Sequence, residues 1–187
     1  MRAFSATLFI AAASLSVSAA NFDKRDVPYN PQVCVDDINT LSQQLIVIKT
    51  TVDAFEPSVG FEGAMEIHNE EKVFEHLLQQ TYRGCCVDTP ANIKEKDEAA
   101  TIDAVGNYAS HVAAALSAMG IKKPDFDVTP PANEHFRGHL ADLTGMVNDL
   151  FSCIAFNTPE KSLPMIKGYN STVTDAFAGA NAIYAED

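Results

Sequence analysis

Apolar residues recur at alternating steps of three and four along most of the chain, starting at Cys34. Such spacing places apolar side chains on one face of a helix. The first stripe comprises Cys34, Ile38, Leu41, Leu45, Ile48, Val52 and Phe55. We expect this helix to end at Glu56 and Pro57, because proline has no N–H and keeps the preceding residue out of the helical region.

Four further segments show a similar periodicity. The second stripe, after a turn over 60–63, comprises Ala64, Ile67, Phe74, Leu77, Leu78 and Thr81. Its charged run Glu70, Glu71 and Lys72 is expected to face outward, and Gly84 is a natural stop. The third stripe comprises Ile102, Val105, Ala109, Val112, Leu116 and Met119, with a stop at Gly120.

The fourth and fifth stripes complete the pattern. The fourth comprises Phe136, Leu140, Leu143, Val147, Leu150 and Ile154. The fifth helix is expected to open at Thr158 and Pro159, and its stripe comprises Ile166, Tyr169, Val173, Ala176, Ala180 and Ile183 or Tyr184. The segment 125–131 is expected to be irregular because it ends in two prolines. With no sustained period-two alternation, the sequence predicts an all-α, up-and-down bundle of about five helices.

The N-terminus resembles a secretory signal. Arg2 is followed by an apolar stretch over 8–13 and by small residues around 17–20, where cleavage is expected. Lys24 and Arg25 form a dibasic pair that a processing protease could cut. We therefore expect a signal peptide over 1–20, a short propeptide over 21–25 and one helical domain over 26–187, secreted to the extracellular space.

Composition limits the partners of such a domain. The chain has 13 basic and 25 acidic residues. Residues 1–25 contain three of the basic residues and one of the acidic residues, so the remaining domain has 10 basic and 24 acidic residues and a net charge of -14. This charge disfavours nucleic acid as a partner. No segment after the signal approaches the roughly 20 apolar residues of a membrane span. Asn170 begins an Asn-Ser-Thr sequon, so a glycan is expected there.

Four cysteines form an even set in an exported chain, which favours two disulfides. Cys85 and Cys86 are neighbours and do not bridge each other easily. Cys34 therefore pairs with one of them and Cys153 with the other, in either arrangement. In an up-and-down bundle all four cysteines lie at the same pole, so we expect a bundle stapled by disulfides at one pole.

Signatures of catalysis are missing from the sequence. It has no Gly-x-Ser-x-Gly elbow, phosphate loop or His-Glu-x-x-His motif, and Cys85 and Cys86 lack the following histidine of secreted phospholipase A2. His135 and His139, with Asp142 on the same predicted face, are explained more simply as boundary residues than as metal ligands. The same holds for His68 beside Glu71 and Glu75. We expect no catalytic residues, no metal site, no cofactor and no enzymatic activity.

The chain resembles the fungal hydrophobic surface-binding protein A family, which includes cell-wall galactomannoproteins. The resemblance lies in the signal, the Lys24-Arg25 pair, the helix pattern and several short segments. These segments are Val52 to Phe55, Ala64 to His68, Ala115 with Leu116, Lys122 to Phe126, Leu140 to Leu143, Pro159, and Asp175 to Tyr184. It covers nearly all of the mature chain, but the cysteines and the lack of a Ser/Thr-rich stalk depart from many members.

This resemblance implies a secreted or wall-associated protein that binds a fatty acid or another lipid, or adsorbs to a hydrophobic surface. A lipid-sized cavity needs large apolar walls, and the same residues would otherwise simply fill the core. The candidate ligand-binding residues are Phe55, Ile67, Phe74, Leu116, Phe136, Leu143, Phe151 and Phe177. The alternative is a helical interaction module that recruits or inhibits a secreted hydrolase. A ligand-sized tunnel would favour the first hypothesis, and a packed core with an exposed apolar patch would favour adsorption or a protein partner.

Overall fold

The computed structural model describes residues 30–87 and 93–185, without the side chains of 130–135. This part contains five α-helices and no strand, as the apolar periodicity predicts. The helices are α1 (Pro31–Ala54), α2 (Gly60–Tyr82), α3 (Glu95–Asp127), α4 (Pro130–Asn157) and α5 (Leu163–Ala185). A short 3-10 helix η1 (Pro57–Val59) precedes α2, and a π-helical turn η2 (Arg83–Val87) follows it. The expected signal peptide, propeptide and dibasic pair lie outside the described residues.

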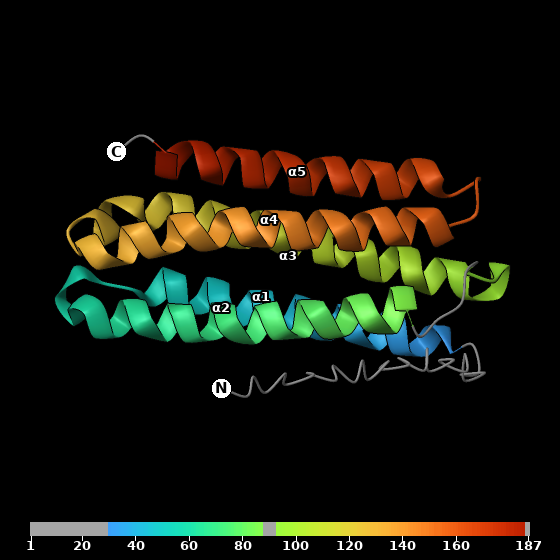
Figure 1. Cartoon of the computed structure of the whole chain (residues 1–187), viewed down its shortest axis with the longest axis horizontal. Helices are drawn as coiled ribbons and strands as arrows, with labels where there is room; N and C mark the ends of the chain where they lie inside the picture. The colour runs from blue at the N-terminus through green and yellow to red at the C-terminus, as the bar shows by residue number, and fades with distance from the viewer. Residues whose placement is uncertain (1–29, 88–92, 186–187) are drawn as a thin grey trace, which may run out of the picture.

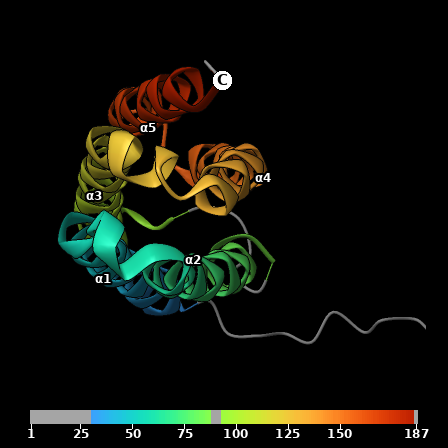
Figure 2. The same ribbon diagram turned by 90° about the vertical axis from the view of Figure 1, so that its left-hand side faces the viewer.

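Successive helices run in opposite directions, which confirms the up-and-down topology (Figure 1). Seen from one end, the helices surround a common interior in the order α1, α2, α4, α5, α3 (Figure 2). Among the five neighbouring pairs of this ring, the contact between α2 and α4 is the least extensive. None of the described helices combines the length and apolar character needed to cross a membrane.

The predicted stripes point into the interior of this ring. Each helix contributes side chains that are almost fully buried, including Leu41 from α1, Ile67 from α2, Val105 from α3, Leu150 from α4 and Ile166 from α5. Burial of a side chain of this size stabilises the fold by about 1.5–3 kcal/mol. The apolar periodicity of the sequence is thus the main determinant of the fold.

Helix α3 is longer than predicted and passes through both Gly120 and Pro124 to Asp127. A proline inside a helix costs roughly 3 kcal/mol. Phe126 offsets this cost, because its side chain is fully buried and its ring centroid lies 4.6 Å from those of both Phe55 and Phe136. The end of α3 is therefore held by tertiary packing that the local sequence does not reveal.

The prediction that 125–131 is irregular was wrong at both ends. Only Val128 and Thr129 separate α3 from α4, which begins at Pro130. Consecutive prolines exclude a helix interior, but the first turn of a helix has no N–H partners to lose. Pro130 and Pro131 occupy that first turn.

Two glycines have roles other than those expected. Gly60 has φ +57° and is the first residue of α2, so the helix begins before the predicted turn over 60–63 has ended. Gly84 does not end the helical conformation, because the chain continues from α2 into the π-helical turn η2. A Cβ at Gly84 would lie 2.4 Å from Oδ2 of Asp37 on α1, so a larger residue there would require the Asp37 carboxylate to move.

Helix α5 begins at Leu163 rather than near Thr158 and Pro159. The Thr158 hydroxyl donates to the Ile154 carbonyl at 2.7 Å, so it closes α4 instead of capping α5. The Ser162 carbonyl accepts the N–H groups of Met165 and Ile166 in the first turn of α5.

Two disulfides staple one pole of the bundle, and the structure selects one of the two pairings that the sequence allows. Cys34 of α1 bonds to Cys85 of η2, with their Cα atoms 4.7 Å apart. Cys86 of η2 bonds to Cys153 near the end of α4, with their Cα atoms 5.9 Å apart. The turn η2 thus connects α2 to both α1 and α4.

Replacing Cys86 and Cys153 together with serine is expected to lower the free energy of unfolding by about 2–4 kcal/mol, because the unfolded chain gains conformational freedom. Urea unfolding followed by circular dichroism measures the loss. The double variant of Cys34 and Cys85 is the comparison, and a similar loss is expected since the two loops span 51 and 67 residues. Unchanged unfolding midpoints would contradict the expectation.

Candidate functional site

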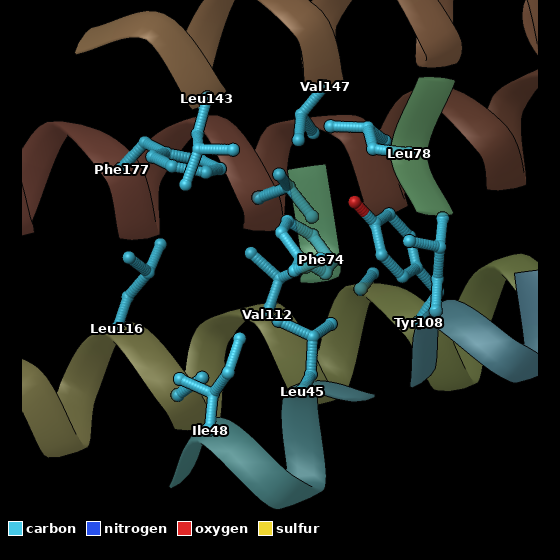
Figure 3. Close-up of a cluster of buried hydrophobic side chains, with 14 of the residues drawn as sticks. Leu45, Ile48, Phe74, Leu78, Tyr108, Val112, Leu116, Leu143, Val147 and Phe177 are labelled. Atoms are coloured by element: carbon cyan, nitrogen blue, oxygen red, sulfur yellow. The ribbon is translucent and has the colours of Figure 1, made fainter. Parts of the chain in front are cut away.

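A small cavity lies at the centre of the ring, and residues from all five helices line it. Figure 3 shows the surrounding cluster of buried side chains, which extend from several helices into one interior. The cavity volume is about 30 Å³. The lining residues are Leu45, Ile48, Glu71, Phe74, Ala115, Leu116, Met119, Leu140, Leu143 and Phe177. With room for a water molecule or two, the cavity is far from the 300–1,000 Å³ typical of ligand pockets.

Four of the eight predicted ligand-binding residues line this cavity. They are Phe74 of α2, Leu116 of α3, Leu143 of α4 and Phe177 of α5. All four are buried. These residues are brought together from four helices, so they are the part of the predicted set that forms a coherent candidate site.

The other four predicted residues are buried in the core but lie outside the cavity lining. Phe55 and Phe136 pack on either side of Phe126. The ring of Phe151 lies 6.1 Å from that of Tyr108. Ile67 is fully buried on α2. For these residues the structure shows core packing, and a ligand contact would require the core to rearrange.

Six of the ten lining residues were outside the predicted ligand-binding set, and Glu71 is the one that was predicted to face outward. The charged run over 70–72 was expected to face outward, but Glu71 is only 4% exposed. The signal was present, because position 71 is four residues after Ile67 and three before Phe74, on the apolar stripe itself. Every other residue that lines the cavity is apolar.

The carboxyl group of Glu71 has an unusual environment. Its Oε2 is buried and has no hydrogen-bond partner among the described residues. Burial raises the pKa of this carboxyl to about 8, and the nearby Lys72 opposes this only in part. Near neutral pH Glu71 therefore carries a proton and can both donate and accept a hydrogen bond.

Glu98 provides a contrast, because it is buried but well partnered. The Ser162 hydroxyl donates to its Oε1, and Lys161 Nζ lies 3.0 Å from its Oε2. The hydrogen bond from Ser162, then that from Lys161, lowers the pKa of Glu98. Glu98 thus remains charged and ties α3 to the start of α5, a structural role that Glu71 does not share.

Two tyrosines also place hydroxyl groups in the interior. The Tyr184 hydroxyl donates to the Met119 carbonyl at 3.0 Å. The Tyr108 hydroxyl is buried without a partner in the described part, and Figure 3 shows it pointing into the cluster. Burial raises the pKa of both phenols, and the charge of Glu71 contributes for Tyr184. Both hydroxyl groups therefore stay protonated.

The histidines considered as metal ligands instead join two helices. The rings of His68 on α2 and His139 on α4 lie 5.0 Å apart. Burial, followed by the charge of His139, lowers the pKa of His68. The side chain of His135 is outside the described residues. In the part of the chain that the structure covers, no three His, Cys, Asp or Glu side chains are grouped so that they could hold a metal ion.

Asn170 lies on α5 and is half-buried, with its Oδ1 enclosed. An N-linked glycan attaches to Nδ2, the other polar atom of this side chain. Glycosylation at Asn170 stays a prediction. Treatment with a glycosidase that removes N-linked glycans, followed by mass spectrometry, would test it.

The fold is similar to that of solved structures with bound fatty acids. No protein-family model matches the chain, and no curated protein matches it in sequence. A crystal structure of AfMP4p in complex with palmitic acid has a TM-score of 0.77 and 15% identity, over 83% of this chain and 99% of that one. Ligand binding domain 2 of Penicillium marneffei MP1 protein in complex with arachidonic acids has a TM-score of 0.70 and 11% identity, over 83% of this chain and 92% of that one.

Proposed function

We propose that this protein is a secreted, non-catalytic carrier that encloses a fatty acid between the helices of its bundle. The observation that carries the proposal is the central cavity, lined by all five helices and apolar except for one carboxyl group. The solved structures of this fold that contain palmitic and arachidonic acids support it. Membership of the hydrophobic surface-binding protein A family and an association with the cell wall are part of the same proposal.

Binding requires the cavity to expand, because about 30 Å³ cannot hold an acyl chain. The contact between α2 and α4 is the least extensive in the ring, so separation there disturbs the fewest interactions. Transfer of an acyl chain from water gains about 0.8 kcal/mol per CH₂ group, or on the order of 10 kcal/mol for a long chain. This gain is large enough to offset the loss of packing around Phe74, Leu143 and Phe177.

Adsorption to a hydrophobic surface is a second candidate. Large apolar side chains are exposed near the two turns that join α1 to α2 and α3 to α4, which lie at the same pole (Figure 1). These are Val59 and Phe61 near the first turn, and Ile121 and Val128 near the second. Such exposure favours contact with an apolar surface. Variants that replace these residues with serine would lose adsorption but keep binding of a fatty acid.

The carrier proposal predicts that the protein purified from its own host contains a fatty acid in a stoichiometric amount. Native mass spectrometry before and after lipid extraction measures this. The delipidated protein is expected to bind cis-parinaric acid, and palmitate should displace it. A protein that carries no lipid and does not bind cis-parinaric acid would refute the proposal.

A substitution that fills the cavity, compared with a matched control, tests whether the ligand binds there. Ala115 lines the cavity, whereas Ala114 on the same helix is half-buried and does not. Ala115→Leu is expected to weaken palmitate binding about tenfold, a change that corresponds to 1.4 kcal/mol. Ala114→Leu is the control and should bind as the unaltered protein does. Equal affinities for the two variants would place the ligand elsewhere.

A further inference from the structure

We infer that the buried carboxyl group of Glu71 anchors the head group of the ligand, through a hydrogen bond to the ligand's own carboxyl group. This inference rests on the proposed function and specifies its chemistry. It assigns to the cavity a long-chain acid whose head group lies in the interior of the bundle rather than at the surface.

The first support is the position and isolation of the Glu71 carboxyl. It provides the polar atoms in an otherwise apolar lining, and its Oε2 has no partner among the described residues. A buried polar group without a hydrogen bond costs roughly 1–3 kcal/mol. A ligand that supplies the missing bond recovers this free energy, so a head group able to hydrogen-bond is favoured over a purely apolar ligand.

The second support is the chemistry of two adjacent carboxyl groups. At neutral pH Glu71 is protonated because burial raises its pKa to about 8. It can donate its proton to an ionised ligand carboxylate, and the pair then shares one proton, as close carboxyl pairs do. Above pH 8 Glu71 in the unliganded protein is already ionised, so binding of a carboxylate requires either the uptake of a proton or the approach of two negative charges. The affinity for a fatty acid should therefore fall as the pH rises through this range.

Lys72 and Lys123, on two of the helices packed around the cavity, are each paired with another carboxylate and are therefore not available to replace the proton. Lys72 follows Glu71 on α2, and its Nζ binds Glu75 at 2.9 Å. On α3, Lys123 Nζ binds the exposed Asp127 at 2.9 Å. Toward the cavity, α1 presents the apolar side chains Leu45 and Ile48.

The remaining titratable groups near Glu71 come from α4 and α5, with one on α2. The ring of His68 on α2 lies 5.0 Å from that of His139 on α4, and burial lowers the pKa of His68. Tyr184 on α5 donates its hydroxyl to a backbone carbonyl, and it stays protonated across the range considered. The proton of Glu71 is thus the main determinant of the expected pH dependence.

Tyr108 offers a matched comparison, since its hydroxyl is also buried without a partner in the described part. Tyr108 does not line the cavity and lies two turns of α3 before Leu116. If the head group lay at that level instead, Tyr108 would be the anchor. The inference therefore predicts different effects for Glu71→Gln, which replaces the titratable carboxyl with a neutral amide, and Tyr108→Phe, which removes the hydroxyl; both keep the shape of the side chain.

The test is to titrate the delipidated protein and both variants with palmitate and with hexadecanol at pH 6 and pH 9. The unaltered protein is expected to bind palmitate at least tenfold more weakly at pH 9, which corresponds to one pKa unit of differential interaction. Hexadecanol carries no charge and should change less than about threefold. Glu71→Gln should remove the excess pH dependence of palmitate binding, and Tyr108→Phe should retain it.

The possible failures are distinguishable. If Glu71→Gln keeps the full pH dependence, or if Tyr108→Phe weakens palmitate binding at pH 6 more than Glu71→Met does, the anchor is not Glu71 although the carrier function stands. If neither ligand binds to any form at either pH, the proposed function itself fails. Glu71→Met serves as a second variant, and it should weaken palmitate binding at pH 6 more than hexadecanol binding.

Discussion

Glu71→Gln is expected to stabilise the protein at pH 9 by on the order of 3–5 kcal/mol, and to have an effect below about 1 kcal/mol at pH 5. The pKa of Glu71 is about 8 in the folded state against a usual 4.5. Between these values the folded state holds a proton that the unfolded state has lost, so the stability of the unaltered protein falls as the pH rises toward 8. Glutamine does not titrate, so the variant escapes this loss.

Urea unfolding at pH 5, 7 and 9 measures the effect as the difference between the variant and the unaltered protein. This difference isolates Glu71 from the other groups that titrate. Glu66→Gln is the control, because Glu66 is exposed on the same helix. A difference for Glu71→Gln that stays constant from pH 5 to pH 9 would show that the carboxyl is not buried as described.

Phe126→Ala is expected to destabilise the protein by about 3–5 kcal/mol, the usual cost of removing a fully buried aromatic ring. The ring packs against Phe55 and Phe136 and compensates for Pro124 within α3. Its loss should also increase hydrogen exchange in the last two turns of α3. Denaturant unfolding and exchange measured by mass spectrometry test these two effects.

Phe156→Ala provides the comparison, because Phe156 is 82% exposed near the end of α4. Surface substitutions of this kind change stability by less than about 0.5 kcal/mol. If Phe126→Ala were as mild as Phe156→Ala, the end of α3 would not pack into the core, and the originally predicted stop at Gly120 would be the better interpretation.

The architecture was predictable where apolar periodicity is strong and local signals agree with it. The stripe from Ile38 to Phe55 leads to the end of α1 at Ala54, just before the predicted break. The common pole of the cysteines was also predictable, because it follows from the alternation of helix directions. The pairing was not, since Cys85 and Cys86 are adjacent and either could reach Cys34.

The ends of α3 and α4 were not predictable from local signals alone. Gly120, Pro124 and the prolines at 130 and 131 all indicate a break, yet the chain leaves the helical conformation only around Val128 and Thr129. The burial of Phe126 outweighs the local preference, and its partners lie on α1 and α4. A contact between residues so far apart in sequence has no signature in a window of neighbouring positions.

Only four of the ten residues that line the cavity were among the predicted ligand-binding residues, for a similar reason. Large apolar residues on a stripe point into the core, but which of them border a cavity depends on how the helices are spaced. Ala115 is small and leaves space for the cavity, whereas the ring of Phe136 is enclosed by other side chains of the core. The charge of Glu71 predicts an exposed side chain, but its place on the apolar stripe determines its burial.

The Cys86–Cys153 disulfide has a mechanical consequence for the exchange of a ligand. It restrains the distance between the C-terminal ends of α2 and α4, the pair whose separation would disturb the fewest interactions. These two helices run in the same direction, so their N-terminal ends remain unlinked at the opposite pole (Figure 1). A separation of α2 and α4 that leaves this bond intact would therefore be widest at the pole where the two helices begin.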